Sequence, residues 1–144
     1  MSYVKIWLHC VWSTKNRDCT IPMSFRPALL KHIRENAVQN MITLDYINAH
    51  IEHVHALINV GKQQNLSTIM QFLKGESSFW INTEKVLPYP FSWQDDYFGV
   101  SISHSHVDQV RQYIKNQDEH HKNMSWEQEA ELFMKKYGFE RIKD

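Results

Sequence analysis

Two β-rich segments that follow each other directly, at residues 41–50 and 51–60, constrain the fold of this chain most strongly. Both are rich in aliphatic and β-branched residues, and neither contains Gly or Pro. Strands this close in the sequence pair antiparallel through a short turn. Helical patterns flank the pair at residues 24–40 and 65–84. We therefore expect the pair to belong to a sheet that helices cover.

Two further strands and two further helices complete the expected order. The last helix begins with a capping box of Ser125 and Gln128. The strands are predicted at residues 3–12 and 97–103, and the helices at residues 105–122 and 126–139. An order of β-α-β-β-α-β followed by two helices is typical of an α+β fold of the ferredoxin-like or RRM-like kind. We expect a four-stranded antiparallel sheet with both crossover helices on one face, in a single domain over residues 1–144.

The composition is that of a compact intracellular domain. Of the 144 residues 42% are hydrophobic, and Gly and Pro are scarce at four each, which argues against disorder. No apolar run approaches the roughly 20 residues needed to cross a bilayer, and the N-terminus lacks the features of a signal peptide. Cys10 and Cys19 show no metal or redox spacing. We expect them to be free thiols in a reducing cytoplasm.

Two histidines interrupt the apolar pattern of residues 51–60. Strand alternation places Val54, Ala56 and Ile58 on one face, which should meet the crossover helices, and His53 and His55 on the other. The first strand should likewise place Trp7 and His9 on the second face. Two neutral imidazoles this close can bind one divalent cation. Ordinary packing of both histidines in the sheet stays open as an alternative, because a short motif alone is weak.

The helix predicted at residues 105–122 supplies the other candidates. Tyr113 and Gln117 are four residues apart and therefore stack on one helix face. A tyrosine hydroxyl, with an ordinary pKa of about 10, becomes a useful nucleophile toward a phosphate that a metal polarises. Gln117 is a candidate third ligand, and His120 or His121 can replace it in that role.

Several segments resemble one known family, and they occur in the same order along nearly the whole chain. "EHVHALI" resembles the HUH motif (two histidines around a hydrophobic residue) of the single-tyrosine transposases of small bacterial insertion sequences, which include the REP-associated tyrosine transposases. "YIKNQ" resembles the Tyr-x-x-x-Gln helix of that family, and "HCVWSTKNR" its first strand with the Thr-Lys-x-Arg stretch. "FLKGESS" and "SWQDDYFGVSIS" also match in position. The chain departs from the family at Asn16, Glu52 and Ala56, none of which is a reacting group.

The resemblance implies metal-dependent cleavage and rejoining of single-stranded DNA at element ends that are recognised through hairpins. By match, Tyr113 is the nucleophile that takes the 5′-phosphate, and His53, His55 and Gln117 hold Mg²⁺ or Mn²⁺. A homodimer in the bacterial cytoplasm is the expected form. Lys15 and Arg17 of the Thr-Lys-x-Arg stretch are candidate contacts to DNA phosphates.

Charge is the feature that fits nucleic-acid binding least. The chain has 16 basic and 16 acidic residues and a formal net charge of zero, whereas nucleic-acid-binding proteins usually carry a basic excess. Residues 1–34 hold six basic side chains against Asp18 alone. A local basic patch can therefore still face a polyanion.

Two other functions fit parts of the sequence. His104 and His106 form a second His-x-His motif, and paired motifs of this kind occur in phosphoesterases that act on cyclic phosphates by general acid–base catalysis. Such enzymes usually carry a hydroxyl residue at the position where both motifs of this chain have their second histidine. We therefore expect His104 and His106 in a turn that enters a helix. An inactive DNA-hairpin-binding protein on the same fold is the other alternative.

Overall fold

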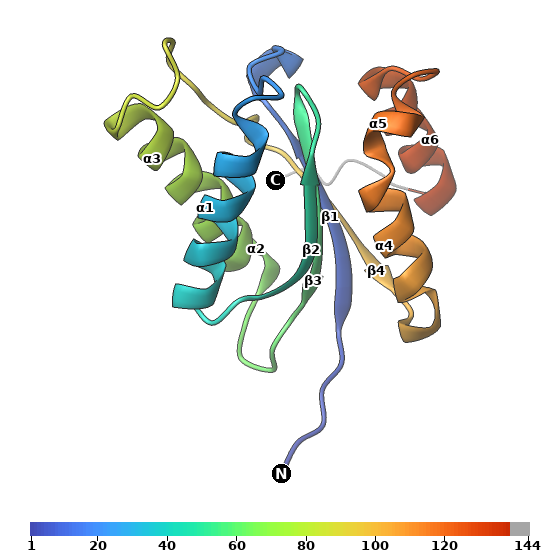
Figure 1. Cartoon of the computed structure of the whole chain (residues 1–144). Coiled ribbons are helices and arrows are strands. Elements are labelled where there is room, and N and C mark those ends of the chain that lie inside the picture. Colours follow the sequence, from blue (N-terminus) through green and yellow to red (C-terminus); the bar gives the residue numbers. More distant parts are fainter. Residues whose placement is uncertain (139–144) are drawn as a thin grey trace.

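A four-stranded antiparallel sheet forms the centre of the protein, as seen in a computed structural model whose residues 1–138 are described. The strands are β1 (Trp7–Ser13), β2 (Thr43–Ala49), β3 (His53–Asn59) and β4 (Phe98–Ile102). Their order in the sheet is β2-β3-β1-β4, and every neighbouring pair is antiparallel (Figure 1). This order, with one helical crossover after β1 and one after β3, confirms the predicted α+β ferredoxin-like fold.

The two crossovers cover one face of the sheet, on the left of Figure 1. They are α1 (Arg26–Gln39), which has a proline in its first turn, and the run α2 (Leu66–Met70), η2 (Gln71–Gly75) and α3 (Glu76–Thr83). The middle piece η2 is a π-helical turn, a local irregularity that leaves the run helical. The helix predicted at residues 65–84 is therefore present as one run with a π turn in its middle.

A second set of helices covers the opposite face, on the right of Figure 1. It comprises η3 (His104–His106), α4 (Val107–Lys115), α5 (Gln117–His120) and α6 (Trp126–Tyr137). α4 lies over β2 and β3, and α6 packs against β1 and β4. The sheet is thus covered on both faces. The helices on this second face are additional to the ferredoxin-like core.

The predicted parity of the strands is confirmed. Cys10 and Trp12 of β1 pack with Val54 and Ala56 of β3 in the core under α1 and α3. Leu57, one position out of phase, packs against α4 instead. Since successive side chains of a strand point to opposite faces, His53 and His55 must point to the face that α4 and α6 cover.

Two elements differ from the sequence prediction by more than two residues or by a break. β1 begins at Trp7 rather than residue 3, because Trp7 already pairs with Asn59 and Ile102, the last residues of β3 and β4. The helix predicted at residues 105–122 breaks at Asn116, whose backbone leaves the helical region (φ −92°, ψ 24°). The end of the last predicted helix, residue 139, lies outside the described residues. Across residues 1–138 no helix has both the length and the apolar character needed to cross a membrane.

Candidate active site

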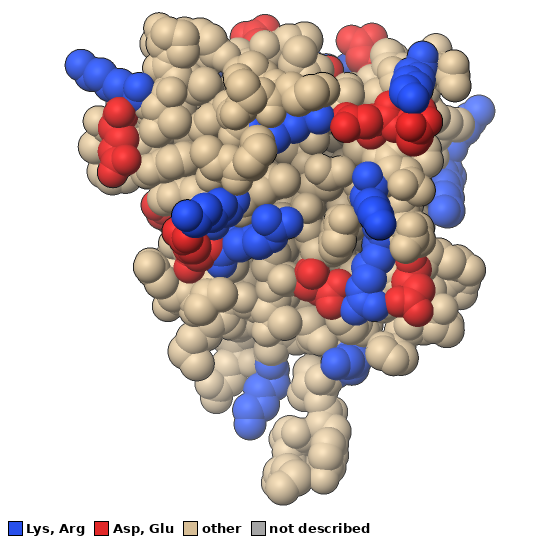
Figure 2. Space-filling view, viewed as in Figure 1, with Lys and Arg blue, Asp and Glu red and all other residues tan. Residues whose placement is uncertain are grey.

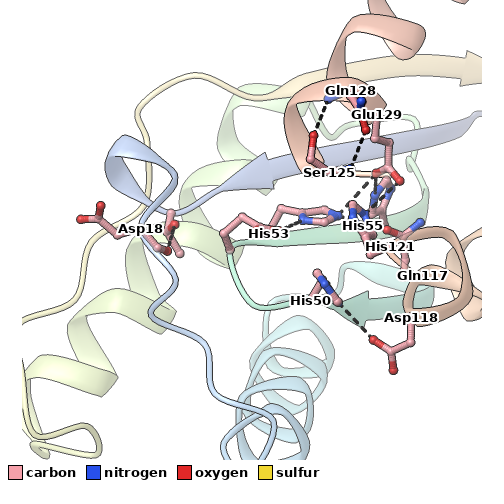
Figure 3. A network of polar contacts seen from close by, with 12 residues as sticks. Asp18, His50, His53, His55, Gln117, Asp118, His121, Ser125, Gln128 and Glu129 are labelled. Carbon is pink, nitrogen blue, oxygen red and sulfur yellow. Dashed lines mark hydrogen bonds and ion pairs between the residues drawn. The ribbon is translucent and has the colours of Figure 1, made fainter. Parts of the chain in front are cut away.

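His53 and His55 direct their Nε2 atoms to one point above the sheet, and both side chains are fully buried. His53 Nε2 lies 3.0 Å from Gln117 Oε1 and 3.4 Å from Glu129 Oε1, and His55 Nε2 lies 2.8 Å from the same Glu129 oxygen. Figure 3 shows these side chains turned toward one another from β3, α5 and α6. Strand alternation alone brings the two imidazoles together, and the helices above supply the oxygens.

Gln117 and Tyr113 reach the site although Asn116 interrupts their helix. Gln117 is fully buried, and its Nε2 donates a hydrogen bond to the Tyr113 carbonyl at 3.4 Å. The half-buried Tyr113 ring lies 5.7 Å from the His55 ring and 6.0 Å from the His9 ring, measured between centroids. The predicted pair therefore lies beside the two histidines.

Two side-chain contacts hold α4 on the sheet of its own chain. Arg111 forms a paired contact with Asp45 of β2, with both N–O distances at 2.7 Å. Asn48 Nδ2 donates a hydrogen bond to the carbonyl of Ile114 at 2.9 Å, near the end of α4. Tyr113 lies between Arg111 and Ile114 in the sequence, so both contacts fix its position over β3.

Glu129 is the site residue that the sequence reasoning missed. It lies on α6 within a stripe of buried apolar residues, one turn after Trp126 and one turn before Phe133, and it is 1% exposed. Trp126 stacks on His53 with ring centroids 4.2 Å apart, which brings this stripe against the histidines. The available signal in the sequence was a carboxylate within the apolar stripe of an amphipathic helix. A carboxylate at such a position is expected to be buried, and buried charges occur where other groups pair with them.

Each histidine has a second partner on its other ring nitrogen. His53 Nδ1 donates to the Glu52 carboxylate at 2.7 Å, and His55 Nδ1 lies 2.9 Å from His9 Nε2. Partners of this kind orient metal-binding imidazoles and set the nitrogen that carries the proton. The two contacts leave both Nε2 atoms facing the shared point near Gln117 and Glu129.

The charge states follow from burial and from Glu129. Burial lowers the pKa of His55 to about 4, so its imidazole is neutral at pH 7. Burial opposes charge on His53 too, but hydrogen bonds to Glu129 and Glu52 outweigh it and raise the His53 pKa. For Glu129 the same contacts with His53 and His55 outweigh burial and hold the carboxyl pKa far below its usual range. Burial and the nearby Glu129 charge raise the pKa of the Tyr113 hydroxyl, which is therefore protonated at neutral pH.

The donor set fits a divalent metal ion. One ligand atom from each of His53, His55 and Glu129 lies within 4.8 Å of the others. Across residues 1–138, no other three His, Cys, Asp or Glu side chains come together in this way. Two imidazoles and a carboxylate suit divalent metals, and the Gln117 amide oxygen adds a neutral donor. The negative charge of the carboxylate would also offset the positive charge of the metal ion in this buried site.

The other candidates from the sequence lie around or away from this point. His121 Nε2 is 3.2 Å from Glu129 Oε2, and the His120 ring lies 4.6 Å from the Tyr113 ring, so both border the site. His104 and His106 form the turn η3 that leads into α4, as expected. His104 accepts a hydrogen bond from Trp7 Nε1 there, and neither histidine joins the metal-binding group.

Lys15 and Arg17 lie in η1 (Lys15–Arg17), directly after β1. Asn16 and Arg17 have positive φ angles of 58° and 56°. Asn tolerates this conformation better than most residues, which explains its presence at this turn. The backbone of Thr14 bonds to the Glu52 carbonyl, and Arg17 pairs with the exposed Glu127 of α6 at 3.2 Å. Arg17 therefore lies close to the start of α6, and Lys15 is exposed in the same turn.

Comparison with known proteins gives one family. A family model described as "Transposase IS200 like" matches residues 2–117. A solved structure described as a "putative transposase" from Deinococcus radiodurans R1 is 27% identical over 81% of this chain and 95% of that one, with a TM-score of 0.62. A REP-associated tyrosine transposase bound to a REP hairpin shares the fold at 15% identity, over 84% and 72% of the two chains, with a TM-score of 0.63. A search of curated proteins finds no match.

The range matched by the family model runs from residue 2 to residue 117, and His53, His55 and Tyr113 lie within it. Glu129 lies beyond it on α6, which explains why a family pattern does not reveal this residue. Because the match spans most of the chain, this protein belongs to the family of IS200-like transposases.

Proposed function

We propose that this protein cleaves and rejoins single-stranded DNA at the ends of an insertion sequence, with Tyr113 as the nucleophile and a divalent metal ion at His53 and His55. The observation that carries the proposal is the convergence of both Nε2 atoms with two side-chain oxygens beside a tyrosine. In this arrangement His53, His55, Gln117 and Glu129 would hold Mg²⁺ or Mn²⁺.

The chemical step conserves the phosphodiester bond energy. Tyr113 Oη attacks the phosphorus, the bond from phosphorus to the 3′ oxygen breaks, and the DNA 5′-phosphate stays on the tyrosine. The tyrosine gives up its proton, and the released 3′ oxygen takes one up as a hydroxyl. Rejoining is the reverse attack by a 3′-hydroxyl on the phosphotyrosine, so no nucleotide cofactor is needed.

A bound metal ion would supply charge stabilisation on the phosphoryl oxygens and favour the ionised tyrosine. The chain's own residues account for the rest of the site. Gln117 orients the segment after Tyr113 through its hydrogen bond to the Tyr113 carbonyl. Glu52 and His9 fix the orientation of the His53 and His55 rings. The raised pKa of Tyr113 in the protein alone means that the tyrosine is a poor nucleophile until positive charge is brought close.

The proposed substrate is a single strand that carries a hairpin. The hairpin-bound relative supports this substrate class. Figure 2 shows Lys and Arg side chains interspersed with Asp and Glu on the side of the molecule seen in Figure 1, so this side carries no continuous basic field. We therefore assign phosphate contacts to local groups, with Lys15 and Arg17 as the first candidates, and we propose a homodimer in the cytoplasm as the working form.

A second candidate function is favoured by one observation. His53, His55, Gln117 and Glu129 are all buried, and the Glu129 carboxylate already contacts both imidazoles. A protein with this site could bind hairpins and never admit a metal ion or a scissile phosphate. The alternative is a DNA-hairpin-binding protein that does not cleave.

One experiment separates the two candidates. The protein is incubated with Mn²⁺ and a labelled pool of hairpin-bearing single strands, and protein–DNA adducts that survive denaturation are mapped by mass spectrometry. We expect an adduct on Tyr113 that Tyr113→Phe abolishes. Tyr3→Phe, a matched loss of one hydroxyl at an exposed residue outside the site, should retain it. An adduct formed by Tyr113→Phe would refute the nucleophile. Hairpin binding without any adduct would support the second candidate, and absence of both would refute both.

A further inference from the structure

A groove runs along the sheet face between α4 and α6, and the reaction proposed above leaves most of it unused. Its volume is about 570 Å³, which lies within the range of small-ligand sites. The floor is formed by His9 of β1 and Ile102 of β4, and the walls include Gln109 and Val110 of α4 and Leu132 and Phe133 of α6.

The groove leads to the reacting groups. Tyr113 and Glu129 both line it, whereas His53 and His55 lie behind them and are fully buried. A DNA strand whose phosphate approaches Tyr113 from solvent would therefore place a neighbouring nucleotide in this space. The groove is continuous with the site of the proposed attack, and the covered metal-binding group lies at its inner end.

The lining suits a flat, uncharged aromatic group better than a phosphate. The rings of His9, Phe133 and Tyr137 line the groove. The His9 and Phe133 rings meet edge to face with their centroids 5.0 Å apart, and the Tyr137 centroid lies 5.0 Å from that of Phe133. Lys136 is the one lysine or arginine in the lining and Glu129 is its one carboxylate, so the groove carries no net attraction for an anion. Gln109 adds an amide that can donate and accept hydrogen bonds at the edge of a base.

We propose that this groove binds one unpaired nucleobase of the substrate strand, the base adjacent to the phosphate that Tyr113 attacks. The assignment rests on the proposed function, because it takes the ligand to be single-stranded DNA. Stacking of a base on aromatic side chains is tolerant of sequence, and a hydrogen-bonding amide can add a preference among bases. The groove would thus position the scissile phosphate by holding the base beside it.

The test compares binding of two strands that differ only in their bases. Anisotropy is measured in EDTA, where no cleavage occurs, with a labelled strand of about 15 thymidines and an abasic strand of the same length and charge. Leu132→Trp fills the groove from α6 with a residue outside the reacting set. Met134→Trp is the matched control, because Met134 is also a partly exposed apolar residue of α6 and does not line the groove. Gln109→Ala, with Gln112→Ala as its control, tests the same groove without adding volume.

We expect the wild type and Met134→Trp to bind the thymidine strand about tenfold more tightly than the abasic strand. The difference should fall to about twofold or less in Leu132→Trp and should shrink in Gln109→Ala. Equal binding of both strands by the wild type, including no measurable binding of either, would overturn the proposal. A preference that persists in Leu132→Trp would overturn the location. Equal binding together with a dimer that Leu132→Trp dissociates would assign the groove to a second copy of the chain. None of these outcomes depends on adduct formation, so failure of the proposed cleavage would be seen separately.

Discussion

Glu129 Oε1 lies 2.8 Å from His55 Nε2, although 74 residues separate the two in the sequence. Both side chains are buried, and the contact joins the last described helix to a central strand of the sheet. α6 therefore does more than cover apolar surface, because it brings a carboxylate to a pair of imidazoles. The same contact explains the charge states of the site, since the three groups set each other's pKa values.

Replacing Glu129 with Gln should weaken Mn²⁺ binding by about tenfold or more, because the site loses its one charged oxygen ligand while its shape is kept. Calorimetric titration of the free protein measures this without any DNA or turnover. Glu127→Gln is the control, since Glu127 lies on the same helix with its side chain 74% exposed. Unchanged affinity in Glu129→Gln would remove Glu129 from the ligand set.

Acid should destabilise the metal-free protein through His55. Burial lowers the pKa of His55 from 6.5 to about 4. Between these two pH values His55 is therefore protonated in the unfolded chain but not in the folded protein. The contribution of His55 to the free energy of unfolding is complete above pH 6.5 and declines toward pH 4, by at most about 3.5 kcal/mol at about 1.4 kcal/mol per pKa unit. His53, whose pKa is raised, works in the opposite direction and reduces the net loss.

Urea unfolding at pH 7 and pH 5, with EDTA present, measures this effect. We expect His55→Gln to show a smaller loss of unfolding free energy between the two pH values than the wild type. The exposed His106→Gln should behave as the wild type does. An identical loss in His55→Gln and the wild type would refute the role of His55.

The active site should be complete within one chain. Asp45 and Asn48 of β2 hold α4 on the sheet of the same protomer, so Tyr113 faces its own His53 and His55. A mixture of Tyr113→Phe and His53→Ala proteins should therefore form no adduct with the hairpin pool. An adduct in that mixture, above the level of either variant alone, would show that the tyrosine helix is exchanged between subunits.

Lys15→Ala and Arg17→Ala should each weaken hairpin binding by a similar factor for all sequences tested, because phosphate contacts carry no base information. Each change should also reduce the slope of log affinity against log salt concentration by about one. Filter binding at several salt concentrations measures both effects. Lys31→Ala is the control, since Lys31 is exposed on α1 on the opposite face of the sheet. Slopes equal to that of the wild type would exclude phosphate contacts.

Much of the fold follows from local patterns in the sequence. The alternation in residues 51–60 predicts both the β3 strand and the face on which His53 and His55 lie, because a strand has a period of two wherever it sits. The capping box of Ser125 and Gln128 predicts the start of α6, and the structure contains both of its hydrogen bonds. These features depend on residues close together in the chain, so they can be read without knowledge of the tertiary structure.

Other features were decided by contacts between distant parts of the chain. β1 begins at Trp7 because its partner strands end there, and the helix of Tyr113 breaks at Asn116, which the spacing of residues did not predict. The place of Glu129 in the site and the groove beside Tyr113 depend on the angle and distance at which α4 and α6 pack on the sheet. Sequence periodicity identifies the buried face of a helix, but the partner of that face is chosen by packing of the whole chain.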